Sequence, residues 1–295
     1  MKKKIALLLA ALLALAGCGR TRTPPEPSID PYEGMVQVES GYGVKMWVKE
    51  LEGVPVSGFS AEDFGEDGTY LGTDFRVTRG IDVSEHQGEI DWAAAAADGI
   101  DFAMIRAGYR GYGEAGTLRE DIYFQANMDG ALGNGVPVGV YFFSQALNAE
   151  EAAEEAAFLM ELLEPYGPAA LALPVYFDWE DITHDAARTN GLDGETITDC
   201  ALAFADALTA AGYTAGVYAY RYLGYFQYDL TRLAGLSLWI GAVGSWPDFY
   251  YAHNLWQYST EGSVAGIDGP VDLDLRFEKL TPEPETTDAP EANES

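Results

Sequence analysis

Between residues 79 and 233, short apolar runs of β-prone residues alternate with segments of helical composition. This alternation restricts the fold more than any other feature, because strands that alternate with helices indicate parallel β-α units. The predicted strands of this region span residues 81–83, 102–107, 136–143, 174–181 and 213–220. The predicted helices span residues 92–97, 120–132, 149–163, 196–211 and 222–233.

The pattern changes after residue 233. Residues 236–242, 254–258 and 271–275 have the composition of strands. The segments between them are rich in Gly, Ser, Pro and Asp and are too short for return helices. The sequence therefore predicts an α/β fold, a TIM-like barrel of eight strands and about five helices, (β/α)5(β)3.

The first 18 residues have the pattern of an export signal. Three lysines precede an apolar run over residues 5–16, which is shorter than the roughly 20 residues that span a bilayer. The signal closes on LAGC, which resembles a bacterial lipobox, so we predict an extracytoplasmic protein anchored to the cell membrane through a lipid on Cys18. The alternative is an ordinary secretory signal that contains a cysteine.

The rest of the chain divides into four segments. Residues 19–31 form a proline-rich linker, and residues 281–295 form an acidic, proline-rich tail that we expect to be disordered. Residues 79–280 form the barrel. Residues 32–78 are an N-terminal extension of unknown fold, either a small β-rich extension packed on the main domain or a spacer.

The charge argues against nucleic-acid binding, and the positions of the cysteines argue against a structural disulfide. The formal net charge is −30, from 17 basic and 47 acidic residues, and a nucleic-acid partner would need clustered Lys and Arg. The two cysteines are Cys18 and Cys200, and the first belongs to the export signal, so we expect no structural disulfide. We predict Cys200 to be a small buried thiol and the chain to be a monomer.

The predicted strand 174–181 carries two carboxylates after an apolar run. Alternate side chains of a strand point the same way, so Tyr176, Asp178 and Glu180 share a face. The Cα atoms of Asp178 and Glu180 would lie about 6.6 Å apart at a rise of about 3.3 Å per residue. This separation suits a pair of acids that cleaves one glycosidic bond.

Acidic and aromatic residues gather at the carboxyl ends of the other predicted strands, where barrel enzymes carry their catalytic groups. Asp82 ends the first strand, and the eighth carries Asp272 and Asp274 on one face. Aromatic rings cover the apolar sides of sugars, so an acidic centre ringed by Tyr and Trp predicts a neutral glycan as the ligand. The candidate sugar contacts are Tyr141, Tyr218, Tyr220, Trp239, Trp256 and Tyr258.

These residues also allow other interpretations. An Asp-x-Glu pair can cap a turn or a helix. Clustered acids can bind Ca²⁺, but the sequence has no calcium-loop spacing. His86, His184 and His253 lack the spacing of metal ligands, so we predict neither a metal nor a cofactor.

Several segments resemble the motifs of glycoside hydrolase family 25, the Chalaropsis-type lysozymes, over about residues 79–280. They are RGIDVSEHQG at 79–88, GVYFFS at 139–144, PVYFDWE at 174–180, LWQY at 255–258 and GPVDLD at 269–274. Phe142 stands where many relatives have histidine, and Asp274 stands where they commonly have asparagine. The aspartate at position 274 leaves open whether Asp272 or Asp274 faces the substrate. By motif position we assign the substrate contact to Asp272.

The resemblance implies an N-acetylmuramidase that cleaves the β-1,4 bond between N-acetylmuramic acid and N-acetylglucosamine in the glycan strands of peptidoglycan. It implies Glu180 as general acid, Asp178 as its partner, Asp82 and Asp272 as negative neighbours, and net retention. Asp178 either attacks the anomeric carbon or assists the N-acetyl oxygen of the substrate, and we favour the second route. The alternatives are a non-catalytic, cell-surface glycan-binding lipoprotein and a hydrolase of another N-acetylated glycan.

Overall fold

The structure is a computed structural model that describes residues 30–280 except 42, 67 and 184. The chain divides into two compact units, and the described part of the first is a turn at 30–33 in which the Glu33 N–H donates to Asp30 O. The predicted export signal, Cys18, most of the linker and the tail lie outside the described residues. No helix in the described part is long and apolar enough to cross a bilayer. The second unit begins at Gly34 and contains every helix and strand of the described part.

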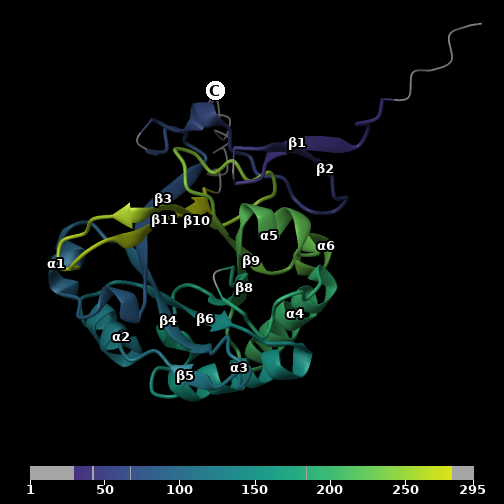
Figure 1. The fold of residues 1–295 in the computed structure, drawn as a ribbon. Helices are drawn as coiled ribbons and strands as arrows, with labels where there is room; N and C mark the ends of the chain where they lie inside the picture. Colours follow the sequence, from purple (N-terminus) through teal and green to yellow (C-terminus); the bar gives the residue numbers. More distant parts are fainter. Residues whose placement is uncertain (1–29, 42, 67, 184, 281–295) are drawn as a thin grey trace, which may run out of the picture. The chain divides into compact units, whose positions relative to one another are not determined.

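Eight strands form a closed barrel (Figure 1), which confirms the predicted fold. Around the barrel the order is β3-β11-β10-β9-β8-β7-β6-β4, and pairing of β3 with β4 closes it. A ninth strand, β5 (Leu118–Glu120), pairs with the end of β4. The barrel strands are β3 (Phe75–Val83), β4 (Phe102–Arg110), β6 (Val138–Ser144), β7 (Val175–Trp179), β8 (Ala215–Tyr220), β9 (Ser237–Gly241), β10 (Leu255–Gly262) and β11 (Val271–Lys279).

Strand β11 is antiparallel to both of its neighbours, whereas all other adjacent barrel strands are parallel. Its beginning therefore lies at the carboxyl end of the other strands. In the β11–β3 register, Asp272 pairs with Asp82, and Asp274 pairs with Gly80, one alternation deeper in the barrel. The two acids that sequence spacing places on one face thus lie at different depths.

Helices follow the first five barrel strands, as the sequence pattern predicts. Helix α4 shows why they form: its residues Ile197, Cys200, Ala201, Phe204 and Leu208 recur at helical spacing and are buried, and the Asp193 side chain caps its first turn. The segment predicted as one helix at 222–233 is two short helices instead, since Asp229 caps a new start. The helices are α1 (Trp92–Ala97), α2 (Phe124–Gly133), α3 (Ala149–Leu163), α4 (Gly194–Ala210), α5 (Arg221–Phe226) and α6 (Leu230–Leu233).

Aromatic side chains fill the barrel interior. The Trp239 ring packs edge-on against Tyr141, Tyr176 and Tyr218, with centroids 4.8–5.7 Å apart. A Cβ at Gly216 would lie 2.4 Å from the Tyr176 ring, so that layer requires glycine. The interior is a packed core whose upper layer forms the floor of the site described below.

The N-terminal extension packs on the barrel beside β10 and β11 and also reaches α5 and α6 (Figure 1). It begins with a hairpin, β1 (Met35–Glu39) and β2 (Lys45–Lys49), and continues as a strap that pairs with the loop before β10 through Ser57 N–H to Tyr250 O and Ala252 N–H to Pro55 O. The Phe64 ring then packs 5.7 Å from Trp256 and 6.1 Å from Phe277. The described part of the extension thus contains a β-hairpin and contacts the barrel through its strap and Phe64.

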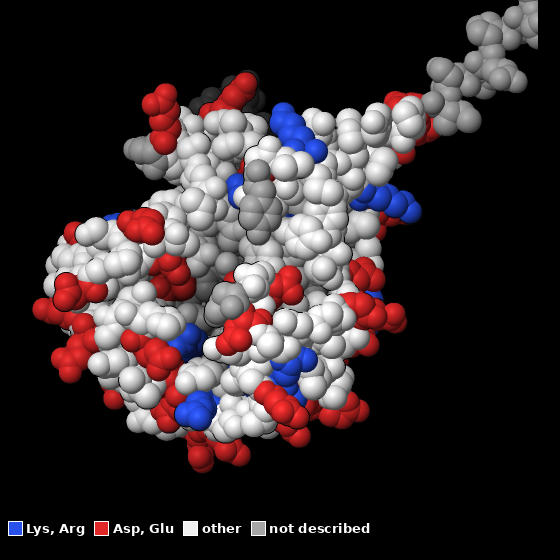
Figure 2. Space-filling view, in the orientation of Figure 1, with Lys and Arg blue, Asp and Glu red and all other residues white. Residues whose placement is uncertain are grey.

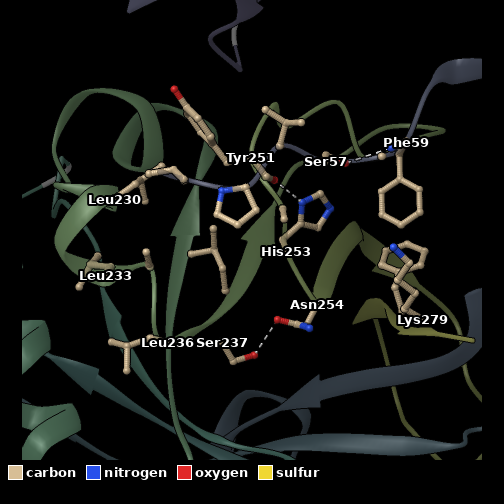
Figure 3. Close-up of a pocket in the computed structure, with 18 of the residues that line it drawn as sticks. Ser57, Phe59, Leu230, Leu233, Leu236, Ser237, Tyr251, His253, Asn254 and Lys279 are labelled. Atoms are coloured by element: carbon tan, nitrogen blue, oxygen red, sulfur yellow. Dashed lines mark hydrogen bonds between the residues drawn. The ribbon is translucent and has the colours of Figure 1, made fainter. Parts of the chain in front are cut away.

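A cavity of about 510 Å³ lies under this strap (Figure 3). Its walls come from the strap around Ser57, from α6 around Leu230 and from the start of β9 around Leu236. His253 lines it with Nδ1 2.9 Å from Tyr251 O, and burial lowers its pKa to about 4. This histidine is therefore a neutral packing residue at physiological pH.

Truncating Phe64 tests whether the extension is part of the folded domain. Phe64→Ala is expected to lower the free energy of unfolding by about 3 kcal/mol, because it opens a cavity over Trp256 and Phe277. Leu71→Ala in the same extension, at a side chain that is 63 % exposed, should stay within about 0.5 kcal/mol of the parent. Urea unfolding would measure both, and a silent Phe64→Ala would mean that the extension does not stabilise the barrel.

Candidate active site

A cleft of about 760 Å³ opens at the carboxyl end of the parallel strands. Four acids line it together: Asp82 of β3, Asp178 of β7, Glu180 directly after β7, and Asp272 of β11. Acidic side chains are spread over the molecular face seen in Figure 2, and basic ones are few. The structure thus gathers in one place the four acids that the sequence singles out.

Asp178 and Glu180 share strand β7 and its continuation. Asp178 pairs in register with Phe143 on one side and Tyr218 on the other, which directs it into the barrel mouth. It is 5 % exposed, and its Oδ1 has no hydrogen-bond partner among the described residues. Burial and the negative charge of Glu180 raise the pKa of Asp178 well above its usual value. Burial, and to a smaller extent Asp272, raise the pKa of Glu180 to about 7. The pair therefore retains a proton near neutral pH.

Arg106 is a cation that acts on Asp178. Its Nε donates to Asp121 Oδ2 at 2.8 Å, and its Nη2 lies 3.1 Å from Glu85 Oε1. Held in this way, Arg106 lines the cleft and opposes the rise in the pKa of Asp178. Arg106 therefore favours the negative charge on Asp178, although burial and Glu180 still raise the pKa of Asp178 overall.

A second acidic group surrounds Gln257. The Gln257 Nε2 donates to Asp82 Oδ2 at 2.8 Å and reaches Asp272 Oδ2 at 3.4 Å, while its Oε1 accepts from the Tyr218 hydroxyl at 2.9 Å. Burial and the charges of Asp274 and Asp272 raise the pKa of Asp82 well above its usual value. Below them Asp274 is fully buried, accepts from Trp239 Nε1 at 2.8 Å, and has a pKa raised by burial to about 7. Asp272 lines the cleft and Asp274 does not.

Three of the six candidate sugar contacts line the cleft: Tyr141, Tyr218 and Trp239. The other three lie elsewhere, which corrects the expectation that they meet the ligand. Trp256 is 0 % exposed on the outer side of β10, where its Nε1 donates to Ala242 O. The Tyr258 ring packs beside the Trp256 ring, with centroids 5.4 Å apart. Tyr220 lies at the start of α5, and its hydroxyl donates to Asp181 Oδ2.

The pairing of β10 explains why Trp256 and Tyr258 face outward. Leu255 belongs to the interior cluster, so Gln257, two residues further along the strand, also points inward. Trp256 and Tyr258 alternate with these residues and therefore point outward. Trp256 is buried there because Phe64 of the N-terminal extension packs against it. Aromatic content alone therefore did not distinguish a sugar platform from a covered outer face.

Sequence analysis missed several residues that line the cleft, above all Arg106 and Gln257. Arg106 carried a signal, since it is the one charged residue within the apolar run 102–107. Gln257 is a polar residue between two aromatics in the segment LWQY, and alternation could have indicated it once the inward parity was known. Tyr109 and Tyr112 also line the cleft and were not predicted. Five other lining residues lie at strand ends that the sequence indicated but received no role in the site: Ser84, Glu85, His86, Gln87 and Phe143.

The described residues hold no group of three or more His, Cys, Asp or Glu arranged to hold a metal ion. Cys200 is buried in α4, where desolvation raises its pKa to about 12, so it is no thiolate nucleophile. The chemistry that this cleft offers is proton transfer and charge stabilisation by carboxyl groups.

Comparison with known proteins finds one family over most of the chain. Residues 81–267 match the family described as Glycosyl hydrolases family 25. The chain is 29% identical over 198 residues to the autolytic lysozyme of Clostridium acetobutylicum, covering 66% of this chain and 55% of that protein. It is 26% identical over 230 residues to lysozyme M1 of Streptomyces globisporus, covering 70% of this chain and 71% of that protein.

Solved structures agree with the fold. The modular autolysin LytC from Streptococcus pneumoniae has a TM-score of 0.60 and 26% identity, covering 83% of this chain and 57% of LytC. A family 25 glycosyl hydrolase from Bacillus anthracis has a TM-score of 0.54 at 22% identity, covering 74% of this chain and 94% of that one, and supports the fold alone. The chain spans little more than half the length of LytC and of the clostridial lysozyme.

Proposed function

The chain belongs to glycosyl hydrolase family 25, and from this premise we propose that it is an N-acetylmuramidase of peptidoglycan. It would hydrolyse the β-1,4 bond between N-acetylmuramic acid and N-acetylglucosamine. The observation that carries the proposal is the meeting of Asp82, Asp178, Glu180 and Asp272 in one cleft with Tyr141, Tyr218 and Trp239. Two relatives are named lysozymes, and LytC has been solved with a synthetic peptidoglycan ligand, which supports this substrate.

Glu180 is the general acid in this proposal. A general acid must carry its proton at working pH, and the raised pKa of Glu180 meets this need. We assign the role of negative partner to Asp178, on whose charge Arg106 acts favourably against the effect of burial. Asp82 and Asp272 add negative charge near the sugar, where the oxocarbenium-like transition state becomes positive.

The reaction would proceed with net retention by substrate assistance. The N-acetyl carbonyl oxygen attacks the anomeric carbon while the leaving glycosidic oxygen takes the proton of Glu180. Water then opens the cyclic intermediate and gives its proton to the Glu180 carboxylate. Asp178 orients and stabilises the acetamido group, since a residue two positions from the acid on one strand is poorly placed to attack from the opposite side. Direct attack by Asp178 is the competing route.

We further propose that the protein works outside the cytoplasm, attached to the membrane through a lipid on Cys18, as a monomer. The support is the charged start, the short apolar run and the LAGC segment. Globomycin, which blocks the lipoprotein signal peptidase, should cause the precursor to accumulate in the producing cell. Cys18→Ser should release the protein from the membrane fraction without changing its activity on isolated walls.

Incubation of residues 19–295 with purified cell walls tests the proposed reaction. New reducing ends should appear in proportion to enzyme and time. Binding to walls without any product would favour a glycan-binding lipoprotein, and cleavage of another N-acetylated glycan in preference to walls would favour a different substrate. The four acids together support the enzyme over the binding protein, because sugar binding alone does not need them.

The pH dependence of cleavage should show the proton of Glu180. Activity is expected to fall about tenfold per pH unit above about 7, because the general acid loses its proton there. The same raised pKa makes the folded protein bind more protons than the unfolded chain, so the free energy of unfolding should also fall as pH rises from about 4.5 to 7.5. Rates and urea unfolding over pH 4.5–9 measure both. A basic limb above pH 9 would contradict the assignment of Glu180.

A further inference from the structure

We propose that Gln145 is a positioning residue for Glu180. Gln145 follows β6 directly, as Glu180 follows β7, and the last pair between these neighbouring strands is Ser144 with Trp179. The two residues are therefore adjacent at the carboxyl edge of the barrel. This inference rests on the proposed role of Glu180 as general acid.

The side-chain amide of Gln145 joins two distant points of the segment that carries Glu180. Its Nε2 donates to Glu180 O at 3.2 Å and to Ser144 O at 2.9 Å. Its Oε1 accepts from the Thr189 hydroxyl at 2.6 Å. Gln145 is fully buried and lines no part of the cleft, so these bonds serve the backbone and not a ligand. One amide thus fixes the start of the segment 180–193 and a point near its end.

Such fixing is needed because the described residues between β7 and α4, 180–183 and 185–193, form no helix or strand. Glu180 is its first residue, and any rotation there would redirect the carboxyl group. A displacement of about 1 Å in a catalytic group can cost about 10²-fold in rate. The Gln145 bond to the Glu180 carbonyl restrains this rotation.

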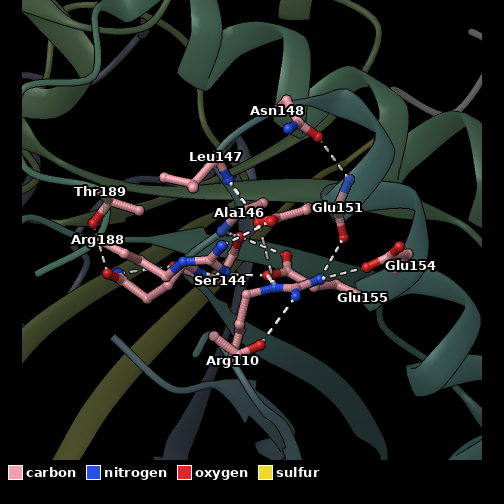
Figure 4. Close-up of polar contacts among 12 residues, drawn as sticks. Arg110, Ser144, Ala146, Leu147, Asn148, Glu151, Glu154, Glu155, Arg188 and Thr189 are labelled. Carbon is pink, nitrogen blue, oxygen red and sulfur yellow. Dashed lines mark hydrogen bonds and ion pairs between the residues drawn. The ribbon is translucent and has the colours of Figure 1, made fainter. Parts of the chain in front are cut away.

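The buried ion pair of Arg110 and Glu155, seen in Figure 4, fixes Gln145 in turn. Glu155 of α3 is fully buried and accepts from Arg110 Nε at 2.7 Å, from Ser144 Oγ at 2.6 Å and from the Gln145 N–H at 3.3 Å. Arg110, at the end of β4, also donates to the backbone carbonyl of Glu151 at 2.8 Å. A buried polar network that is satisfied in this way specifies one geometry.

The far part of the segment is tied to the same network. Arg188 Nη2 donates to Glu151 Oε1 at 2.7 Å, and its backbone N–H donates to Tyr112 O at 2.9 Å. Tyr112 lines the cleft, whereas Thr189 and Arg188 do not. The network therefore connects the catalytic segment with the cleft wall, which Arg110 and Tyr112 line.

Thr189→Val removes only the hydroxyl that holds Gln145 and keeps the side-chain shape. We expect kcat on cell walls to fall about tenfold with KM within about twofold, and Thr189→Ser to restore kcat. Gln145→Met should lower kcat about 10²-fold with a similar KM. A structural role alone would lower the melting temperature without separating kcat from KM.

Thr198→Val is the matched control. The Thr198 hydroxyl is also buried, donating to Gly194 O at 2.7 Å and accepting from the Asp229 N–H at 3.0 Å, but it lies away from the cleft. It should lose stability as Thr189→Val does and keep its kcat. If Thr189→Val and Gln145→Met keep kcat within twofold, or lose it only as the control does, the positioning role is wrong.

Hydrogen–deuterium exchange separates this inference from the proposed function, since it requires no turnover. Exchange over residues 180–190 should rise in Gln145→Met and Thr189→Val and stay unchanged in Thr198→Val. Equal protection of this segment in all variants would overturn the inference. A wild-type protein that cleaves no wall glycan would refute the muramidase proposal, while the exchange result would still decide whether Gln145 holds the segment.

Discussion

Glu180→Gln is expected to lower the rate of wall cleavage at pH 6 by about 10³-fold or more. The amide has nearly the shape of the acid but no proton to give, so the leaving sugar must depart as an alkoxide. Binding of wall glycan should change little, because the aromatic floor of Tyr141, Tyr218 and Trp239 is untouched. Release of reducing ends, measured beside pull-down on the same walls, would separate the two effects.

The same substitution should not destabilise the fold. Burial and Asp272 make the charged form of Glu180 unfavourable, and a neutral amide removes that cost. At pH 8 we expect Glu180→Gln to unfold at equal or higher urea, with a gain of about 1 kcal/mol. An inactive variant that is also less stable would point to a loss of structure, and an active one would remove Glu180 from the mechanism.

Asp178→Asn should lower the rate by about 10²–10³-fold on ordinary walls. Asp178 is buried, and its charge is the one that Arg106 favours, so the amide deprives the developing positive charge of its partner. Asp206→Asn on the exposed face of α4 is the matched control and should be silent. Retention of more than a third of the activity in Asp178→Asn would contradict its role.

Walls from which the N-acetyl groups have been removed distinguish the two routes for Asp178. If the acetamido oxygen attacks the anomeric carbon, the wild-type protein should cleave these walls at least 10²-fold more slowly than acetylated ones, since the internal nucleophile is lost. If Asp178 attacks directly, cleavage should persist and a glycosyl ester on Asp178 should be trapped by rapid quenching. Mass analysis of the quenched protein would detect that ester.

The barrel could be predicted from sequence because its signals are local. Apolar runs such as 136–143 and amphipathic segments such as 149–163 carry their own period, and the two lie within two residues of β6 and α3 at each end. The placement of Asp178 and Glu180 on one face could also be predicted, since it depends only on the alternation of side chains along one strand. What depends on one element can be deduced from that element.

The residues that were misplaced or missed depend on several elements at once. Whether Trp256 or Gln257 faces inward is decided by the register of β10 with β9 and β11. The depth of Asp274 below Asp272 follows from the antiparallel direction of β11, which the count of strands does not reveal. The cover of Trp256 by Phe64 is a contact across almost two hundred residues. The link from Gln145 to Thr189 has no sequence pattern at all.

The most direct test of the account is the identity of the sugar at the new reducing ends. Walls digested with wild-type protein should be reduced with borohydride, hydrolysed and analysed for the sugar alcohols. The account predicts that muramitol appears in proportion to the bonds cleaved, and that it is absent with Glu180→Gln. Glucosaminitol in its place, or muramitol released equally by Glu180→Gln, would contradict it.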